Sequence, residues 1–370
     1  MICPRCLNQE EEFFYRVNNQ IYCRKCIQFS KTTIDQEIQK VNMICDNQAN
    51  YHLDFELSQA QAKISHQLKQ NYIQCQDSKV NAVCGAGKTE IVFEVIQYVL
   101  SRYGRVCFTT PRTELTKELY QRIKEEFKDV TISLVCGGHT DDLNGQLVVC
   151  TTHQLYRFYQ SFDLLILDEM DAFPYHGNEV LENILHQSVK GRIVYLSATM
   201  QDEDALNLTK RYHGYDIPVP RFIPCPYYIS LLLCYYHIKQ FHKQNKQVLI
   251  YVDAKSSAYK VHTFLNKFNV KTKVVHAGMS NIQEILQQLK DVEIDAVVCT
   301  TILERGITMK NIQVIVLNAT SKIYDRATLI QIAGRVGRKS DYPTGEVLLY
   351  GVYKTKAIKE CINQIRKDNV

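Results

Sequence analysis

The sequence predicts an α/β protein in which two parallel-sheet lobes follow a small cysteine-rich module. Three observations lead to this fold class. Apolar runs of strand length alternate with amphipathic segments of helix length through most of the chain, and this alternation is typical of parallel sheets covered on both faces. The proline-rich stretch PVPRFIPCP, residues 218–226, separates two such series. Two CxxC pairs precede both series.

Length and composition agree with three parts. We expect residues 1–50 to form the module and a linker, residues 51–218 the first lobe, and residues 219–370 the second. Ordinary domains run roughly 100–200 residues, and a hydrophobic content of 45% with 22% charged residues is that of a globular protein. The opening MICPRC lacks the charged-then-apolar run of a signal peptide. The cysteines outside the CxxC pairs lie in apolar segments, so reduced thiols in a cytosolic protein are expected.

The module contains Cys3 and Cys6, then Cys23 and Cys26 after a gap of sixteen residues. Two such pairs offer Zn²⁺ four thiolates in tetrahedral geometry. The segment between them alternates as a hairpin with Asn18 and Asn19 near its turn. So short a segment buries little core, and the metal is expected to supply most of its folding free energy, on the order of 10–16 kcal/mol. A redox CxxC is the alternative, but neither pair lies in a βαβ context.

The first lobe begins with a glycine-rich loop, AVCGAGKTE, between a short strand around Val80 and a helical segment. Glycines in such a loop let the backbone N–H groups point at a polyphosphate, with the lysine on the terminal phosphates and the threonine hydroxyl on Mg²⁺. ATP with Mg²⁺ is the expected ligand. The residues expected to bind it are Gly85, Ala86, Gly87, Lys88, Thr89 and Glu90.

Asp168 and Glu169 follow the apolar strand at residues 162–167. An acid at this place can hold the Mg²⁺ between the β- and γ-phosphates, and its neighbour can polarise the attacking water as a general base. A D-E pair after a strand is also an ordinary helix cap. Its occurrence downstream of a phosphate loop favours the catalytic interpretation, with Asp168 and Thr89 on the metal and Glu169 as the base.

Hydroxyl residues, a proline and an arginine lie at the ends of several other predicted strands. Because strand ends of a parallel sheet gather ligands, we expect them to contact successive phosphates of one nucleic-acid strand. Each of them alone could also be a turn or a cap. They are Thr110, Pro111, Arg112, Thr151 and Thr152 in the first lobe, and Thr300 and Thr301 in the second. Ser197-Ala198-Thr199 and Glu304-Arg305-Gly306 also lie at strand ends, where they could couple nucleotide to nucleic acid.

The second lobe has strand-like runs but no phosphate loop of its own, and it carries the motif QIAGRVGR. On a helix, Gln331, Arg335 and Arg338 would be spaced i, i+4 and i+7 and would share one face. Such a face fits an arginine finger opposite Lys88, worth roughly 10³–10⁵ in rate. Surface arginines with glycine kinks are the alternative interpretation.

Net charge alone decides little. The chain carries a formal charge of +5, and eight lysines lie between residues 237 and 274 against the single acid Asp253. A nucleic-acid backbone would suit that stretch, but so would a solvated helical face. The most apolar window, residues 227–236, is shorter than the ~20 residues that span a bilayer. Its place after the proline-rich junction favours a buried strand.

Taken in order, these motifs resemble those of superfamily 2 helicases. The set is AVCGAGKTE, TTPRTEL, TTHQL, DEMDAFP, SAT, CTTILERGIT and QIAGRVGRK. The motifs AVCGAGKTE and DEMDAFP, preceded by a four-cysteine module, resemble those of the ComFA family of competence motors. The helicase PriA has motifs of a similar style. The resemblance implies two tandem RecA-like lobes and places Gln61 near the adenine. Thr308 stands where many relatives carry aspartate, which argues against a ribose contact there.

The resemblance also implies a function. It implies an ATP-dependent translocase or helicase on single-stranded DNA that drives DNA uptake in bacterial competence and transformation. Such a protein would be cytoplasmic, at the inner face of the cytoplasmic membrane, with a ComFC-like, phosphoribosyltransferase-like partner in the uptake machinery. Oligomeric state stays open, a homo-oligomer included. The alternatives are an RNA or replication-restart helicase, or a zinc-anchored DNA-binding adaptor that hydrolyses ATP poorly, although the intact Lys88, Asp168, Glu169 and Arg338 argue against the adaptor.

Overall fold

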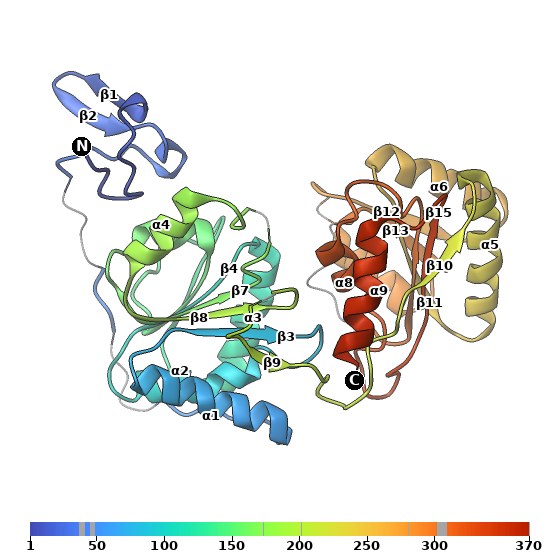
Figure 1. Ribbon diagram of the computed structural model, residues 1–370, viewed down its shortest axis with the longest axis horizontal. Helices are drawn as coiled ribbons and strands as arrows, with labels where there is room; N and C mark the ends of the chain where they lie inside the picture. Colours follow the sequence, from blue (N-terminus) through green and yellow to red (C-terminus); the bar gives the residue numbers. More distant parts are fainter. Residues whose placement is uncertain are drawn as a thin grey trace. The chain divides into compact units, whose positions relative to one another are not determined.

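A computed structural model describes residues 1–36, 41–44, 49–172, 174–200, 202–279, 281–301 and 309–369. The chain divides into two compact units. The first contains residues 1–82 and 87–208, and the second contains residues 83–86 and 209–370. Each unit is built on one parallel sheet (Figure 1), which confirms the predicted fold class. The expectations for Glu304, Arg305, Gly306 and Thr308 fall outside the described residues.

The module is a two-stranded antiparallel hairpin with short 3₁₀ turns on either side. Strand β1 (Phe14–Val17) pairs with β2 (Gln20–Cys23). Asn18 and Asn19 adopt φ of 47° and 61°, the left-handed conformation that a two-residue hairpin turn requires at both positions. The turns are η1 (Glu11–Phe13) and η2 (Ile27–Phe29). The hairpin predicted from the alternating pattern is therefore confirmed.

In the described part of the first unit, seven parallel strands form a sheet in the order β5-β6-β4-β7-β8-β3-β9. Their bounds are β3 Ser78–Ala82, β4 Val106–Thr110, β5 Ile132–Val135, β6 Leu147–Thr151, β7 Phe162–Asp168, β8 Val189–Ser197 and β9 Leu206–Leu208. Every residue of β4 and β6 is buried, as expected of strands covered on both faces. Since all seven run parallel, the polar residues that follow β3, β4, β6, β7 and β8 lie along one edge.

The helices of this unit follow the predicted alternation. They are α1 Gln59–Ile73, η3 Glu90–Val92, α2 Phe93–Leu100, α3 Thr113–Glu126, η4 Thr152–Arg157 and α4 Glu179–Ser188. Helix α1 starts at a capping box in which Ser58 and Gln61 bond each other's backbone N–H groups, the reciprocal arrangement of an S-x-x-Q sequence. The segment after β6 is the short 3₁₀ helix η4 and not an α-helix.

The described part of the second unit has six parallel strands in the order β10-β15-β14-β11-β13-β12. The strands are β10 Arg221–Pro224, β11 Gln247–Tyr251, β12 Thr272–Val275, β13 Ala296–Cys299, β14 Ile312–Val316 and β15 Val347–Gly351. The helices are α5 Tyr227–Lys243, α6 Lys255–Lys267, α7 Ile282–Lys290, α8 Arg326–Ala333 and α9 Lys356–Asp368.

One expectation about this unit is wrong. The apolar window at residues 227–236 belongs to α5 and not to a strand. Leu231, Cys234 and Ile238 are buried at helical spacing, whereas Leu232 and Tyr236 are exposed. Among the described residues, no helix combines the length and the apolarity needed to cross a membrane.

Candidate functional site

The glycine-rich loop leaves β3 in the curled conformation that the sequence predicts. Gly85 and Gly87 have φ of +83° and +79°, values that glycine adopts at no steric cost. Space also requires glycine at the second position, because a β-carbon on Gly87 would lie 2.4 Å from Nε2 of Gln61 and 3.1 Å from Oε2 of Glu90. The loop is therefore fixed both by its backbone and by the side chains packed against it.

Lys88 lies beside the acid pair at the tip of β7. Its Nζ is 3.9 Å from Oδ1 of Asp168, and the two side chains are only 17% and 20% exposed. The same Asp168 oxygen accepts a hydrogen bond from the backbone N–H of Glu169 at 2.9 Å. Glu169 has φ of +59°, which is uncommon for a residue with a side chain and concentrates at functional sites. An ammonium and a carboxylate are thus brought together where a magnesium-bound polyphosphate could bind, and Glu169 follows the carboxylate in sequence.

Gln61 and Glu90 support this loop from two helices. Gln61 is 2% exposed, and its Oε1 accepts the Ser58 N–H at 2.9 Å. Its amide nitrogen faces Gly87, so the structure brings Gln61 to the loop. Glu90 is also 2% exposed and forms an ion pair with Arg122 of α3. Sequence reasoning missed Arg122, because nothing in the local pattern of α3 sets it apart.

The residues after β7 and β8 are linked by a hydrogen bond. The Thr199 hydroxyl donates to Oδ2 of Asp171. Ser197 Oγ accepts the backbone N–H groups of Thr199 and Met200, both at 3.0 Å. The SAT tripeptide is therefore tied to the acidic motif through side chains, which gives its predicted coupling role a physical connection.

The threonines expected at nucleic acid are mostly buried. Thr110, Thr151 and Thr152 are 2%, 5% and 0% exposed. The Thr110 hydroxyl donates to the Arg112 carbonyl at 3.2 Å, at the start of α3. A phosphate at these strand ends would therefore meet main-chain groups and the half-buried Arg112 side chain rather than the hydroxyls. Pro111 is buried, and Thr300 and Thr301, which follow β13 in the second unit, are half-buried.

The QIAGRVGR motif does not form one helical face. Helix α8 ends at Ala333, and residues 334–337 form a turn. Gly337 has φ of +70°, and a β-carbon there would lie 2.2 Å from the Pro343 carbonyl; this conformation ends the helical geometry. Arg338 Nε donates to the Gly334 carbonyl at 2.9 Å. Gln331 is on α8, whereas Arg335 and Arg338 follow it, so the expectation of a shared face at i, i+4 and i+7 is wrong. Gln331 and Arg335 are 5% and 2% exposed.

Arg211 holds this turn, and no motif in the sequence pointed to it. Its Nη1 donates to the carbonyls of Val336 and Gly337 at 2.8 and 2.7 Å, and its Nη2 donates to that of Gly334 at 3.2 Å. The side chain is 3% exposed, and burial lowers the pKa of Arg211 to about 10. Carbonyls that follow a helix carry partial negative charge, so this turn is a favourable place for a buried guanidinium.

The four cysteines of the module form one buried cluster. All four Sγ atoms lie within 4.8 Å of one another. Cys3 and Cys26 are 3.8 Å apart at sulfur, as are Cys6 and Cys23. A tetrahedral ion with metal–sulfur bonds of about 2.3 Å has sulfur–sulfur edges of roughly 3.8 Å. The cluster therefore has the residue type, spacing and burial of a structural metal site.

Comparison with known proteins matches both units. Residues 58–208 match the DEAD/DEAH box helicase family and residues 229–340 the helicase conserved C-terminal domain. The chain is 33% identical over 396 residues to competence protein ComFA of Bacillus subtilis (strain 168), covering 99% of this chain and 85% of that protein. It is 33% identical over 395 residues to competence protein ComFA of Streptococcus pneumoniae (strain ATCC BAA-255 / R6), covering 100% and 90%.

The fold is also similar to that of solved helicases. S. cerevisiae Dbp5 bound to RNA and ADP BeF3 superposes with a TM-score of 0.59 at 16% sequence identity. The superposition covers 85% of this chain and 92% of that one. RecG bound to a three-way DNA junction superposes with a TM-score of 0.61 at 18% identity, covering 88% of this chain and 48% of that one. At these levels of identity the likeness concerns the fold alone.

Proposed function

Because this chain belongs to the ComFA family of superfamily 2 competence helicases, we propose that it is a DNA-dependent ATPase that moves along single-stranded DNA during DNA uptake. The observation that carries the proposal is the placement of Lys88 beside Asp168, with Glu169 next in sequence, at the carboxyl edge of a parallel sheet. Ligands of such sheets bind at that edge. Phosphoryl transfer depends on a lysine and a metal-holding acid placed in this way.

In this proposal the loop N–H groups and Lys88 bind the phosphates of ATP, and the Thr89 hydroxyl and Asp168 hold Mg²⁺. The metal neutralises charge on the phosphates when it is bound. Glu169 accepts the proton of the attacking water, and its unusual backbone conformation sets the direction of its side chain. Gln61 and Glu90 help to keep the loop in place, because their side chains fill the space where a β-carbon on Gly87 would lie.

We also propose that residues of the second unit take part in catalysis. Arg335 and Arg338 stabilise charge on the transferred phosphoryl group, with Gln331 beside them, when nucleotide is bound. Arginines in this role contribute roughly 10³–10⁵ to the rate. Their common support is the turn that Arg211 holds.

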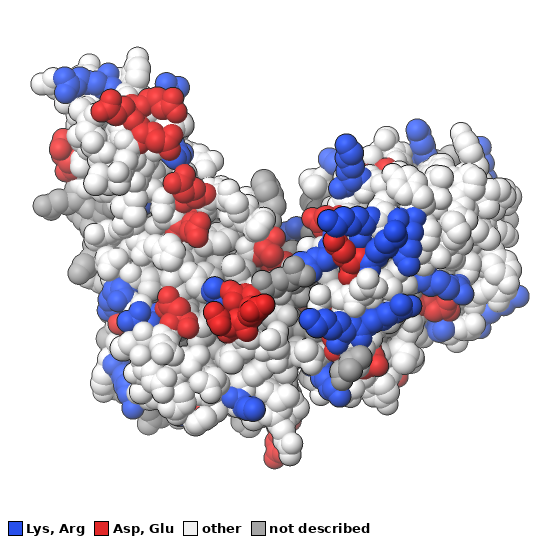
Figure 2. Space-filling view, viewed as in Figure 1, with Lys and Arg blue, Asp and Glu red and all other residues white. Residues whose placement is uncertain are grey.

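Nucleic acid binds at other strand ends in this proposal. The residues proposed to contact it are the last residue of a parallel strand or come directly after one. They are Thr110, Pro111, Arg112, Thr151 and Thr152 in the first unit, and Thr300 and Thr301 in the second. The lysines between residues 237 and 274 are all exposed or half-buried, and Figure 2 shows Lys and Arg side chains gathered over the second unit. Such a surface suits a phosphate backbone. We further propose that the protein acts with a ComFC-like partner as part of the DNA-uptake machinery. It would do so at the inner face of the cytoplasmic membrane.

The cysteine cluster binds Zn²⁺ in this proposal. Structural zinc sites are commonly made of four cysteine thiolates. The four buried cysteines of the module have sulfur–sulfur distances that suit such a tetrahedral site. The metal's contribution there is to folding, since the hairpin around it is too short to bury a core of its own.

The test is the ATPase rate of the full chain with and without defined oligonucleotides, repeated at several salt concentrations. We expect stimulation by single-stranded DNA that weakens as salt rises, because phosphate contacts release counterions. Preferential stimulation by RNA would favour the RNA-helicase alternative. Absence of turnover under all conditions, with nucleic acid still bound, would favour the adaptor.

A further inference from the structure

The cysteine module packs directly on the first unit through Phe29. This side chain is 5% exposed, and its ring centroid lies 5.8 Å from that of His153 and 5.7 Å from that of Tyr156. Both partners belong to η4. Phe29 and the four cysteines belong to the same buried apolar cluster as Leu155 of η4. The module is thus part of the core of this unit and not an appendage on a tether.

Arg5 reinforces the same contact. It is 8% exposed, and its Nη1 donates to the carbonyls of Phe29 and Ser30 at 3.1 and 2.8 Å. Its guanidinium carbon lies 5.0 Å from the centroid of the Tyr156 ring, within the range of a cation–π interaction. Arg5 sits between Cys3 and Cys6 in the first knuckle, so the metal site and the η4 contact share the same few residues.

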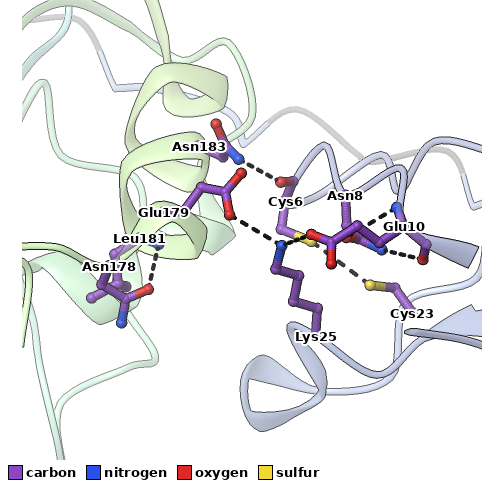
Figure 3. Close-up of polar contacts among 9 residues, drawn as sticks. All are labelled: Cys6, Asn8, Glu10, Cys23, Lys25, Asn178, Glu179, Leu181 and Asn183. Atoms are coloured by element: carbon purple, nitrogen blue, oxygen red, sulfur yellow. Dashed lines mark hydrogen bonds and ion pairs between the residues drawn. The ribbon is translucent and has the colours of Figure 1, made fainter. Parts of the chain in front are cut away.

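A second attachment joins the module to α4, as Figure 3 shows. Lys25 Nζ is 3.1 Å from Oε2 of Glu179 and also pairs with Glu10. Asn183 Nδ2 donates to the Cys6 carbonyl at 2.9 Å. Helix α4 itself packs on η4. The module is therefore held on two elements that contact each other, and one of its holding points is the backbone of a metal ligand.

The exposed charges of the module are mixed. Glu10, Glu11 and Glu12 are exposed, and so are Arg16, Arg24 and Lys31. Arg5 and Lys25 are engaged with the protein, as described above. Charge therefore does not assign the module a role, whereas its contacts with η4 and α4 connect it to a predicted nucleic-acid contact.

We propose that the metal-loaded module positions residues 151–157, so that metal occupancy raises the affinity for single-stranded DNA while nucleotide binding stays unchanged. Strand β6 ends at Thr151 and η4 follows immediately, so the packing of Phe29 and Arg5 on η4 fixes the orientation of the strand end. The phosphate loop lies on the other side of β4, β7 and β8 in the strand order. The inference rests on the proposed function in taking this strand end as a contact with DNA.

The experiment uses the full chain and the substitution Phe29→Ala, which removes the packing without touching a metal ligand or a charge. Three quantities are measured: zinc per chain, the Kd of a fluorescent ATP analogue, and the Kd of a fluorescein-labelled oligothymidylate at fixed salt. Hydrogen exchange of a peptide that covers residues 151–157 is followed in parallel. We expect faster exchange in that peptide, an oligonucleotide Kd raised about fivefold or more, and an unchanged nucleotide Kd.

Tyr15→Ala is the matched control, because Tyr15 is an aromatic residue of the same hairpin that is 52% exposed. It should match wild type in all four measurements. Phe29→Leu keeps an apolar side chain at the contact, so it should bind the oligonucleotide almost as tightly as wild type does. A difference between Phe29→Leu and Phe29→Ala at equal zinc content would show that the packing, and not unfolding of the module, sets the affinity. Wild type stripped of zinc by a chelator should behave as Phe29→Ala does and recover when zinc is returned.

Two failures are distinguishable. Wild type that does not bind the oligonucleotide would refute the proposed function. Wild type that binds it while zinc-loaded Phe29→Ala binds equally well, or shows unchanged exchange at residues 151–157, would overturn only the positioning role.

Discussion

Lys88 Nζ lies 3.9 Å from Oδ1 of Asp168, although Lys88 is in the loop after β3 and Asp168 is the last residue of β7. Strands β3 and β7 are separated by β8 and run parallel to it, so both deliver the residues that follow them to the same edge. The sheet topology, and not proximity in sequence, brings a cation and an acid together. This arrangement allows the candidate site to be tested one residue at a time.

Replacing Lys88 by Ala should lower ATP turnover by roughly 10²-fold or more, the size of effect seen when one positioned electrostatic group is removed. The fold should persist, because the side chain is partly exposed and the loop is held by Gly85 and Gly87. Turnover and thermal unfolding measure the two effects. Lys79→Ala is the control, since Lys79 is a β3 lysine paired with Asp202 at the surface and should leave turnover unchanged. Near-normal turnover in Lys88→Ala would refute the assigned site.

Glu169→Gln should abolish most turnover but retain nucleotide binding. Glutamine has nearly the shape of glutamate and occupies the positive φ at similar cost, but it cannot accept the proton of the attacking water. Asp168→Asn should instead weaken Mg²⁺-dependent nucleotide binding. Titration with a fluorescent ATP analogue, with and without Mg²⁺, separates the two variants. If both lose binding equally, Glu169 does not act as the base.

Local pattern predicted most of the strands and the curled backbone of the glycine-rich loop. Strands such as β4 and β6 are buried on both faces, so apolar residues are consecutive in them and do not alternate with exposed polar ones. The curled loop was expected from its glycines, and it is made by the positive φ of Gly85 and Gly87, which glycine adopts without strain. The hairpin turn at Asn18 and Asn19 was predictable for a related reason, since asparagine tolerates the left-handed conformation better than most residues.

Long-range packing could not be predicted in this way. Helix α5 carries apolar residues on its exposed side as well, Leu232 and Tyr236 among them. Its apolar residues therefore do not recur only every three or four positions, which is the pattern that identifies an amphipathic helix in a sequence. The turn at Gly337 passes close to the Pro343 carbonyl, which leaves no room for a β-carbon, and the local pattern of the motif does not reveal this approach. The contact of Phe29 with η4 joins residues more than a hundred positions apart.

Removing the metal, by chelation or by Cys23→Ser, should unfold the hairpin at residues 14–23 and leave nucleotide binding largely intact. The metal is expected to supply most of the folding free energy of this segment, whereas Lys88 and Asp168 lie on a sheet with its own buried core. Hydrogen exchange across residues 14–23 and a nucleotide titration report the two effects. Cys75→Ser is the control, because Cys75 is exposed and outside the cluster. Loss of nucleotide binding would show that the module supports the phosphate loop as well.

Arg211→Met should destabilise the second unit by about 1–3 kcal/mol, because it leaves the Val336 carbonyl without its side-chain donor. It also removes one of the two side-chain donors of the Gly334 carbonyl. Arg211→Lys should rescue little, since an ammonium lacks the planar fork that reaches several carbonyls at once. Turnover should fall as well, because the same turn carries Arg335 and Arg338. Urea denaturation measures the stability. The matched control is Arg221→Met on β10, where the guanidinium is 60% exposed and pairs with Glu346 at the surface; surface pairs of this kind contribute about 0–1 kcal/mol. An unfolding midpoint for Arg211→Met equal to that of wild type would show that the turn keeps its shape without this guanidinium.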